Sequence, residues 1–171
     1  MNTDINQEVH NAFEIIKEGG IILYPTDTVW GIGCDATNPD AVAKIYQLKQ
    51  REETKSMIVL MNGEKMMYNV FAKIPEVAWE ILDHSERPTT LILDQPKNVA
   101  KNIIAEDNTL GIRIVKEPFC FKLMERMKRP LVSTSANISG NPTPMNFKEI
   151  SPEIIKGVDY VVNLHHDKVC K

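Results

Sequence analysis

The chain has 171 residues, of which 43% are hydrophobic and 25% are charged, and it carries a formal net charge of −3. This composition is typical of one globular domain over residues 1–171 with enough apolar side chains for a sizeable core. The slightly acidic balance does not indicate a protein that coats nucleic acid, although it leaves room for a local basic face.

No run of apolar residues reaches the length of a membrane helix, and the polar first residues lack the apolar region of a signal peptide. The three cysteines, Cys34, Cys120 and Cys170, lie far apart and form no C-x-x-C pair. This usage predicts reduced thiols in the cytoplasm and argues against a disulfide framework or a zinc ribbon. Membrane contact is not expected, because the apolar runs are too short.

Two helices are predicted early in the chain, one on each side of a short apolar strand over 21–24. The first has apolar residues at helical spacing behind a cap at Thr3 or Asp4, and Gly19-Gly20 ends it. The second begins at Asn38-Pro39, a capping side chain followed by proline at the first helical position.

The strand is followed by a polar stretch that contains two hydroxyls, a carboxylate and two glycines. It reads Pro25-Thr26-Asp27-Thr28-Val29-Trp30-Gly31-Ile32-Gly33. Pro25 ends the strand pattern, so we expect a loop, and loops at strand ends are where α/β proteins place ligand sites. The alternative is a structural turn in which Thr and Asp bond their own backbone. The glycine spacing also fits a dinucleotide fingerprint, but the helix begins too late for that motif, so a nicotinamide or flavin site is not predicted.

A cluster of cations follows the second helix, in Lys49-Gln50-Arg51-Glu52-Glu53-Thr54-Lys55, just before a predicted strand over 57–60. Basic residues at a helix C-terminus commonly oppose the helix dipole in solvent. The functional alternative is a clamp for a polyphosphate, since Arg offers a planar fork and Lys a point charge.

Residues 62–87 have two apolar helical stripes separated by Pro75, and strands are predicted over 88–93 and 109–115. Arg113 lies inside the second of these strands. It faces solvent on the outer side of the pleat, or it faces inward and needs an anionic partner such as a ligand carboxylate.

A helix over 117–128 carries cations that form an exposed basic face, available to RNA phosphates or simply solvated. A strand then runs into a second hydroxyl-rich loop, Ser133-Thr134-Ser135-Ala136-Asn137-Ile138-Ser139-Gly140. Such loops present hydroxyls and backbone amides to phosphate or carboxylate oxygens, although an Asn-Gly turn region is the structural alternative. The neighbouring His165 and His166 would point to opposite faces of a strand, so no protein-held metal is predicted there.

The chain resembles the YrdC-like threonylcarbamoyl-adenylate synthase family. The resemblance rests on the order and spacing of four motifs between residues 24 and 143: the stretch 25–33, Lys49-x-Arg51, Thr109-x-Gly111-x-Arg113, and the stretch 133–140. It implies a YrdC/RibB-like α/β fold with a twisted, mixed, largely parallel sheet and flanking helices around a concave basic cavity. It also implies a nucleotidyltransferase that forms threonylcarbamoyl-AMP and pyrophosphate from ATP, L-threonine and bicarbonate. That product serves the threonylcarbamoyl modification of an adenosine in tRNA.

The resemblance also assigns roles to residues of this chain. Thr28, Arg113 and Ser133 would bind L-threonine, and Arg113 would hold its carboxylate in a bidentate pair. Lys49 and Arg51 would bind the ATP phosphates and act in catalysis. Further contacts to the nucleotide would come from Thr109, Ser135, Asn137 and Thr143.

The hypothesised mechanism is positioning and charge neutralisation. The amine of threonine forms a carbamate, and a carbamate oxygen attacks the α-phosphorus. Mg²⁺ would be held mainly by ATP phosphates and water, and no side-chain nucleophile is required. Among partners, the resemblance implies tRNA or double-stranded RNA and other tRNA-modification proteins.

The chain departs from the family pattern in several places. Glu52 stands where proline is frequent and Leu60 where some members have a histidine, and the sequence ends at Lys171, before a Ser-Thr segment found in many members. A second class of function therefore stays open, an RNA- or nucleotide-binding module without synthase activity.

Overall fold

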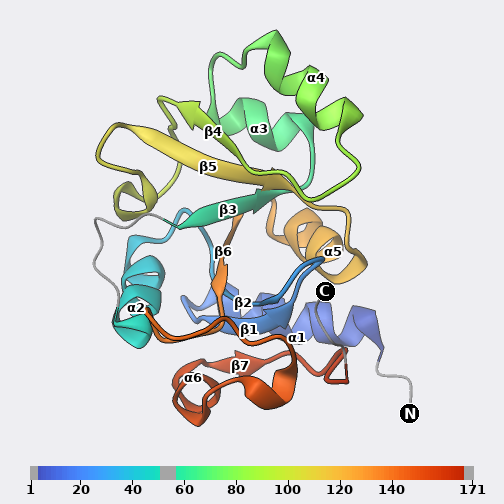
Figure 1. Ribbon diagram of the computed structural model, residues 1–171, viewed down its shortest axis with the longest axis vertical. Coiled ribbons are helices and arrows are strands. Elements are labelled where there is room, and N and C mark those ends of the chain that lie inside the picture. Colours follow the sequence, from blue (N-terminus) through green and yellow to red (C-terminus); the bar gives the residue numbers. More distant parts are fainter. Residues whose placement is uncertain (1–3, 51–56, 168–171) are drawn as a thin grey trace.

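The computed structural model describes residues 4–50 and 57–167. Seven strands form one sheet in the order β4-β5-β3-β6-β2-β1-β7, with helices around it (Figure 1). The strands are β1 (Ile22–Pro25), β2 (Trp30–Gly33), β3 (Ile58–Met61), β4 (Leu91–Asp94), β5 (Thr109–Ile114), β6 (Leu131–Ser135) and β7 (Tyr160–Val161). The helices are α1 (Ile5–Lys17), α2 (Pro39–Lys49), α3 (Glu64–Val70), α4 (Glu76–His84), α5 (Pro118–Met127) and α6 (Pro152–Gly157), with 3-10 turns η1 (Lys101–Ile103) and η2 (Phe147–Glu149).

The sheet is mixed, as expected, but the expectation that it is largely parallel is wrong. The pairs β1–β2, β2–β6, β3–β6 and β4–β5 run antiparallel, whereas β1–β7 and β3–β5 run parallel. For β1 and β2 the physical reason lies in the connection, because parallel neighbours need a long crossover whereas a short loop forces an antiparallel pair. The antiparallel pairs of β6 with β2 and with β3 join segments that are far apart in the sequence. Between β1 and β2 the connection consists of residues 26–29 alone.

The stretch predicted as a loop after Pro25 is therefore a β-hairpin, and Trp30–Gly33 form a buried strand. The glycines explain why this strand was missed and why it fits. A Cβ at Gly33 would collide with the carbonyl oxygen of Val132 on β6 and with the Tyr24 ring. Only glycine allows β2 to approach its neighbours this closely.

Strand β6 joins the two halves of the sheet. Its first residues pair with β3, with Ser133 opposite Ile58, and its last residues pair with β2, with Ser135 opposite Gly31. In Figure 1, β6 stands between the β3–β5–β4 group and the β2–β1–β7 group. Residues from both groups therefore meet along β6.

The helix starts agree with the predicted caps. Asp4 accepts a hydrogen bond from the Asn6 amide at 2.9 Å, and Asn38 accepts from the amides of Asp40 and Ala41. Each cap satisfies amides that a helix leaves unpaired at its first turn. The predicted end of the first helix is also confirmed, since Gly19 takes a positive φ of 88°.

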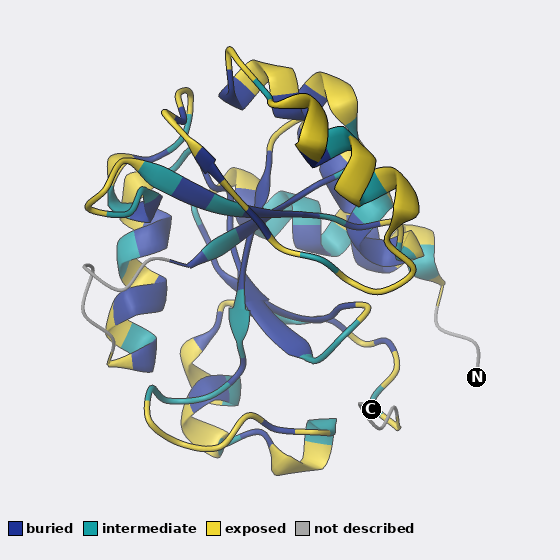
Figure 2. Ribbon diagram, turned by 45° about the horizontal axis from the view of Figure 1, so that its top comes forward, coloured by how far each residue is buried: buried dark blue, intermediate teal, exposed yellow. Residues whose placement is uncertain are grey.

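The core lies along the central strands, while α4 at one end is mostly exposed (Figure 2). Both β1 and β2 are buried throughout. Near the C-terminal end, His166 stacks on Phe147 with ring centroids 4.0 Å apart, and both rings contact Trp30 on β2. Within 4–50 and 57–167, no helix combines the length and hydrophobicity that crossing a bilayer requires.

Candidate active site

A pocket of about 240 Å³ lies where the β1–β2 loop, β3, β5 and β6 meet. All three residues assigned to L-threonine border it: Thr28 from the hairpin loop, Arg113 from β5 and Ser133 from β6. Ser135, assigned to the nucleotide, borders it too. The structure thus brings together residues more than 100 positions apart in the sequence.

The hairpin loop is held in one shape by Thr26. Its hydroxyl donates to the carbonyl oxygen of Val29 at 2.6 Å and accepts from the amide of Thr28 at 3.0 Å. These local bonds are those expected of a Thr-containing turn. They fix the direction of Thr28, whose hydroxyl lies 3.1 Å from that of Thr26.

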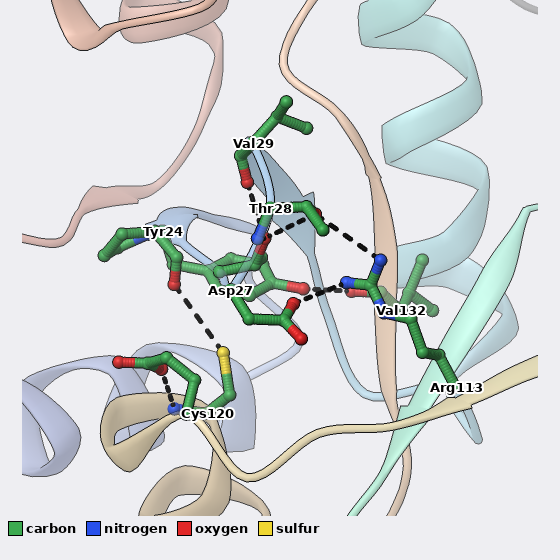
Figure 3. Close-up of polar contacts among 10 residues, drawn as sticks. Tyr24, Asp27, Thr28, Val29, Arg113, Cys120 and Val132 are labelled. Carbon is green, nitrogen blue, oxygen red and sulfur yellow. Dashed lines mark hydrogen bonds and ion pairs between the residues drawn. The ribbon is translucent and has the colours of Figure 1, made fainter. Parts of the chain in front are cut away.

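Arg113 faces inward and is only 8% exposed. Its Nη2 forms an ion pair with Oδ1 of Asp27 at 3.0 Å, and its Nη1 lies 3.4 Å from the Thr28 hydroxyl. Figure 3 shows the guanidinium reaching from β5 to both loop residues. The prediction that an inward Arg113 needs an anion is confirmed, and the chain itself supplies one in Asp27.

One donor of Arg113 is left over. Its Nε is buried and has no hydrogen-bond partner among the described residues. A buried N–H without a partner costs free energy. Among the described residues that border this pocket, Arg113 is the only charged one, so it would attract an anionic group.

Lys49 is the other buried cation near the pocket, with 1% exposure. Its ammonium lies 2.8 Å from the Thr134 hydroxyl, 2.6 Å from the Ser135 carbonyl oxygen and 3.1 Å from Oδ1 of Asn137. The expectation of a solvated helix end is wrong for this residue. Lys49 binds the hydroxyl-rich loop after β6 instead, because that loop places several oxygens around its ammonium group.

The remaining nucleotide-assigned residues divide into three groups. Asn137 and Thr143 border a second pocket of about 300 Å³, which is lined mainly by the loop after β6. Thr109 borders neither pocket, since it lies four residues before Arg113 on β5, about 13 Å away along the strand. Arg51 lies outside the described residues, and so does Lys55.

The basic face predicted on α5 is partly used within the fold. Arg126 lies over the Phe13 ring at 4.6 Å, Lys122 donates to Asn6, and Arg129 forms a 2.9 Å ion pair with Asp35. The first two contacts hold α5 against α1, and the third joins the segment after α5 to the residue that follows β2. RNA binding by this face, like the wider concave basic cavity, stays a prediction.

Two groups beside the pocket are held in their neutral forms. Burial raises the pKa of Tyr24, whose hydroxyl donates to the Val132 carbonyl oxygen at 2.9 Å. Burial also raises the pKa of the Cys120 thiol, which lies 3.6 Å from the carbonyl oxygen of Pro25. Neither group is therefore an activated nucleophile, which agrees with chemistry that proceeds by positioning.

Sequence reasoning missed two residues of the site. Asp27 had no role assigned, although a carboxylate next to Thr28 was a signal that Arg113 has an internal partner. Thr134 borders the pocket and accepts from Lys49, but nothing in the sequence distinguished it from its neighbours.

The fold and site define a mixed α/β protein with a small polar pocket where a hairpin loop meets the sheet. The chain belongs to the Sua5/YciO/YrdC family: the family model, described as telomere recombination, matches residues 14–170.

Named relatives agree with this membership. The chain is 32% identical to a threonylcarbamoyl-AMP synthase of Pseudoalteromonas translucida, covering 89% of this chain and 83% of that one. It is 36% identical to a putative threonylcarbamoyl-AMP synthase of Methanocaldococcus jannaschii, covering 98% and 81%. It is also similar to P. abyssi Sua5, solved in complex with L-threonine, with a TM-score of 0.84 and 26% identity. That alignment covers 94% of this chain and 47% of Sua5, so the chain spans about half the length of that relative.

Proposed function

We propose that this protein is an enzyme that forms L-threonylcarbamoyl-AMP from L-threonine, bicarbonate and ATP. The observation that carries the proposal is the convergence of Thr28, Arg113 and Ser133 on one pocket. The relatives named as threonylcarbamoyl-AMP synthases and the Sua5 complex with L-threonine support the same activity.

L-Threonine would bind first in the 240 Å³ pocket. Its carboxylate would accept hydrogen bonds from Arg113, and the hydroxyls of Thr28 and Ser133 would fix its orientation. The amine nitrogen would then bond to the carbon of bicarbonate with loss of water, which gives a carbamate. One carbamate oxygen would attack the α-phosphorus of ATP, and pyrophosphate would leave.

The nucleotidyltransferase step requires ATP next to the threonine pocket. Ser135 borders that pocket, while Asn137 and Thr143, from the loop after β6, border the 300 Å³ pocket. ATP along this loop would bring its α-phosphate toward the carbamate. In this proposal Arg51 binds the phosphates and Lys49 holds the loop after β6 in place. Thr109 contacts the nucleotide from the start of β5.

In this proposal the metal arrives with the nucleotide. The described part of the chain has no cluster of three or more His, Cys, Asp or Glu side chains suited to a metal ion. Hard cations prefer oxygen ligands, which the triphosphate supplies. Mg²⁺ bound to the ATP phosphates would neutralise part of their charge during the transfer.

A product assay tests the proposal. The purified protein is incubated with ATP, L-threonine and bicarbonate, and pyrophosphate release is measured with and without threonine. Threonine-dependent pyrophosphate is expected. No such release, together with tRNA binding, would favour an RNA-binding module without synthase activity. Binding of tRNA, contact with other tRNA-modification proteins and a cytoplasmic location remain proposals that this assay does not address.

A further inference from the structure

We propose that the outer edge of β4 is a docking site for an extended segment of a partner protein, which adds to the sheet as a further strand. The segment carries an apolar side chain and, two residues away, a lysine or arginine. The groove beside this edge shares no lining residue with the two pockets of the proposed active site, so the inference goes beyond the proposed function.

The first argument is the direction of the backbone groups of β4. This strand lies at one end of the sheet and, among the described strands, pairs with β5 alone (Figure 1). One residue beyond it, the amide of Gln95 donates to the carbonyl oxygen of Asn108, just before β5, at 2.9 Å. Amides point alternately to the two sides of a strand, so those of Ile92 and Asp94 point away from β5. No hydrogen bond within the described residues reaches either amide from that side.

The second argument is a groove of about 490 Å³ beside this edge. It is lined by Ile92, Leu93, Asp94 and Gln95 on one side and by residues 72–75, which connect α3 to α4, on the other. Neighbouring residues of a strand face opposite sides of the sheet, so a groove that borders four consecutive residues runs along the edge. The wall over 72–75 reads Ala-Lys-Ile-Pro and is mainly apolar. An extended segment in the groove therefore meets backbone groups on one side and apolar side chains on the other.

The third argument is the pattern of side chains along the edge. Ile92 is 71% exposed, the largest value for a large hydrophobic residue in the described part of the chain. Asp94 is also exposed and forms no ion pair with another described residue. Leu91 and Leu93 alternate with them and are buried, so Ile92 and Asp94 share one face. Residues opposite each other on paired strands interact, so an apolar residue opposite Ile92 and a cation opposite Asp94 give a favourable pairing.

The charge of Asp94 also argues against a second copy of this chain as the occupant. If β4 paired with its own copy in antiparallel fashion, Asp94 would face one of residues 90–94, which include no lysine or arginine. Self-pairing would therefore leave this carboxylate without an opposite charge. A segment of another protein that carries a cation at the matching position satisfies it.

The test uses the synthetic peptide acetyl-Thr-Thr-Ile-Thr-Lys-Thr-Thr-amide, which places an apolar side chain and a cation on one face of a strand. NMR titration measures its affinity, and hydrogen exchange measures the protection of the Ile92 and Asp94 amides. We expect saturable binding with a Kd of about 1 mM or tighter and slower exchange of both amides. The same peptide with N-methyl groups on its Ile and Lys cannot donate to the edge and should bind at least about tenfold more weakly.

Two variants test the edge itself. Asp94→Lys should bind the lysine peptide about two- to fivefold more weakly than the unmodified protein does, and a peptide with Asp in place of Lys more tightly by the same factor. Ile92→Pro removes an outward amide without removing a bond to β5, so it should bind either peptide at least about fivefold more weakly. Glu125→Lys is the matched control, because it makes the same charge change at an exposed residue of α5 that does not border the groove. It should leave both affinities nearly unchanged.

Three results would overturn the inference. They are the absence of saturable binding, equal affinity for the plain and the N-methylated peptide, and binding that leaves the exchange of the Ile92 and Asp94 amides unchanged. Sedimentation equilibrium tests the other occupant. A dimer of the unmodified protein that Ile92→Pro converts to monomers would show that a second copy pairs at this edge, which overturns the assignment to a partner protein.

Discussion

Arg113 and Lys49 are both buried cations near the 240 Å³ pocket, yet their surroundings differ. Arg113 has one short ion pair, one long contact of 3.4 Å and one buried N–H without a partner in the described structure. Lys49 has hydrogen bonds to Thr134, Ser135 and Asn137, all from its own chain.

The difference shows how two residues of the same charge can serve a site in separate ways. A guanidinium that borders a pocket can bind an anionic oxygen of a ligand. An ammonium group surrounded by acceptors of the protein stabilises the wall itself. We therefore expect changes at Arg113 to alter ligand binding and changes at Lys49 to alter stability.

The largest effect is expected for Arg113→Ala. Removing the guanidinium deletes the partner of the ligand carboxylate, so the KM for L-threonine should rise about 100-fold or more, with little change in the KM for ATP. Steady-state pyrophosphate release at varied threonine and ATP measures both constants. Arg129→Ala removes an arginine that pairs with Asp35 away from the pocket and should leave both constants nearly unchanged. Equal rises in both constants for Arg113→Ala would contradict its role.

Lys49→Met should instead lower the free energy of unfolding by about 2–4 kcal/mol, because it removes charge-assisted hydrogen bonds and leaves their acceptors unsatisfied. Urea unfolding measures the change. Lys44→Met is the control from the same helix, since Lys44 is exposed and donates to the Gly19 carbonyl oxygen, at 3.2 Å. If Lys49→Met keeps its free energy of unfolding but has a much higher KM for ATP, Lys49 binds phosphate rather than stabilising the loop after β6.

Smaller effects are expected for the hydroxyls of the threonine pocket. Thr28→Val and Ser133→Ala each remove one neutral hydrogen-bonding group, so the affinity for L-threonine should fall about fivefold. Calorimetric titration of each variant with L-threonine measures this loss. Thr37→Val changes a threonine that bonds to Asp35 outside the pocket and serves as the control. A 100-fold loss for either pocket hydroxyl would mean that Arg113 does not dominate binding.

The smallest effect concerns alkaline pH. Burial raises the pKa of Cys34 and Cys120 above their ordinary value, so at high pH the unfolded chain loses thiol protons that the folded chain keeps. Stability from these thiols is fully present below a pH of about 8.5 and is lost as the pH rises above it. Urea unfolding between pH 7 and 10 should show this decline, and Cys120→Ala should make it shallower. If the free energy of unfolding of Cys120→Ala declines with pH as steeply as that of the unmodified protein, Cys120 does not contribute to the decline.

Much of the fold was predictable because it depends on local rules. The caps at Asp4 and Asn38, the helix end at Gly19 and the break at Pro75 follow from backbone preferences of single residues. The strand at Trp30–Gly33 was not predictable in this way, because its glycines are poor strand formers that are required only by the close approach of β6 and Tyr24. The direction of the strands was likewise decided by pairing between distant segments.

The sequence by itself determined which kinds of groups the site contains: hydroxyls in two loops, a cluster of cations and an arginine within an apolar strand. It also carried the family motifs, since those depend on residue type and spacing. Only the tertiary structure decided which of these groups meet. The pairing of Arg113 with Asp27 and the burial of Lys49 against the loop after β6 depend on contacts across 86 and 88 positions, which no local pattern encodes.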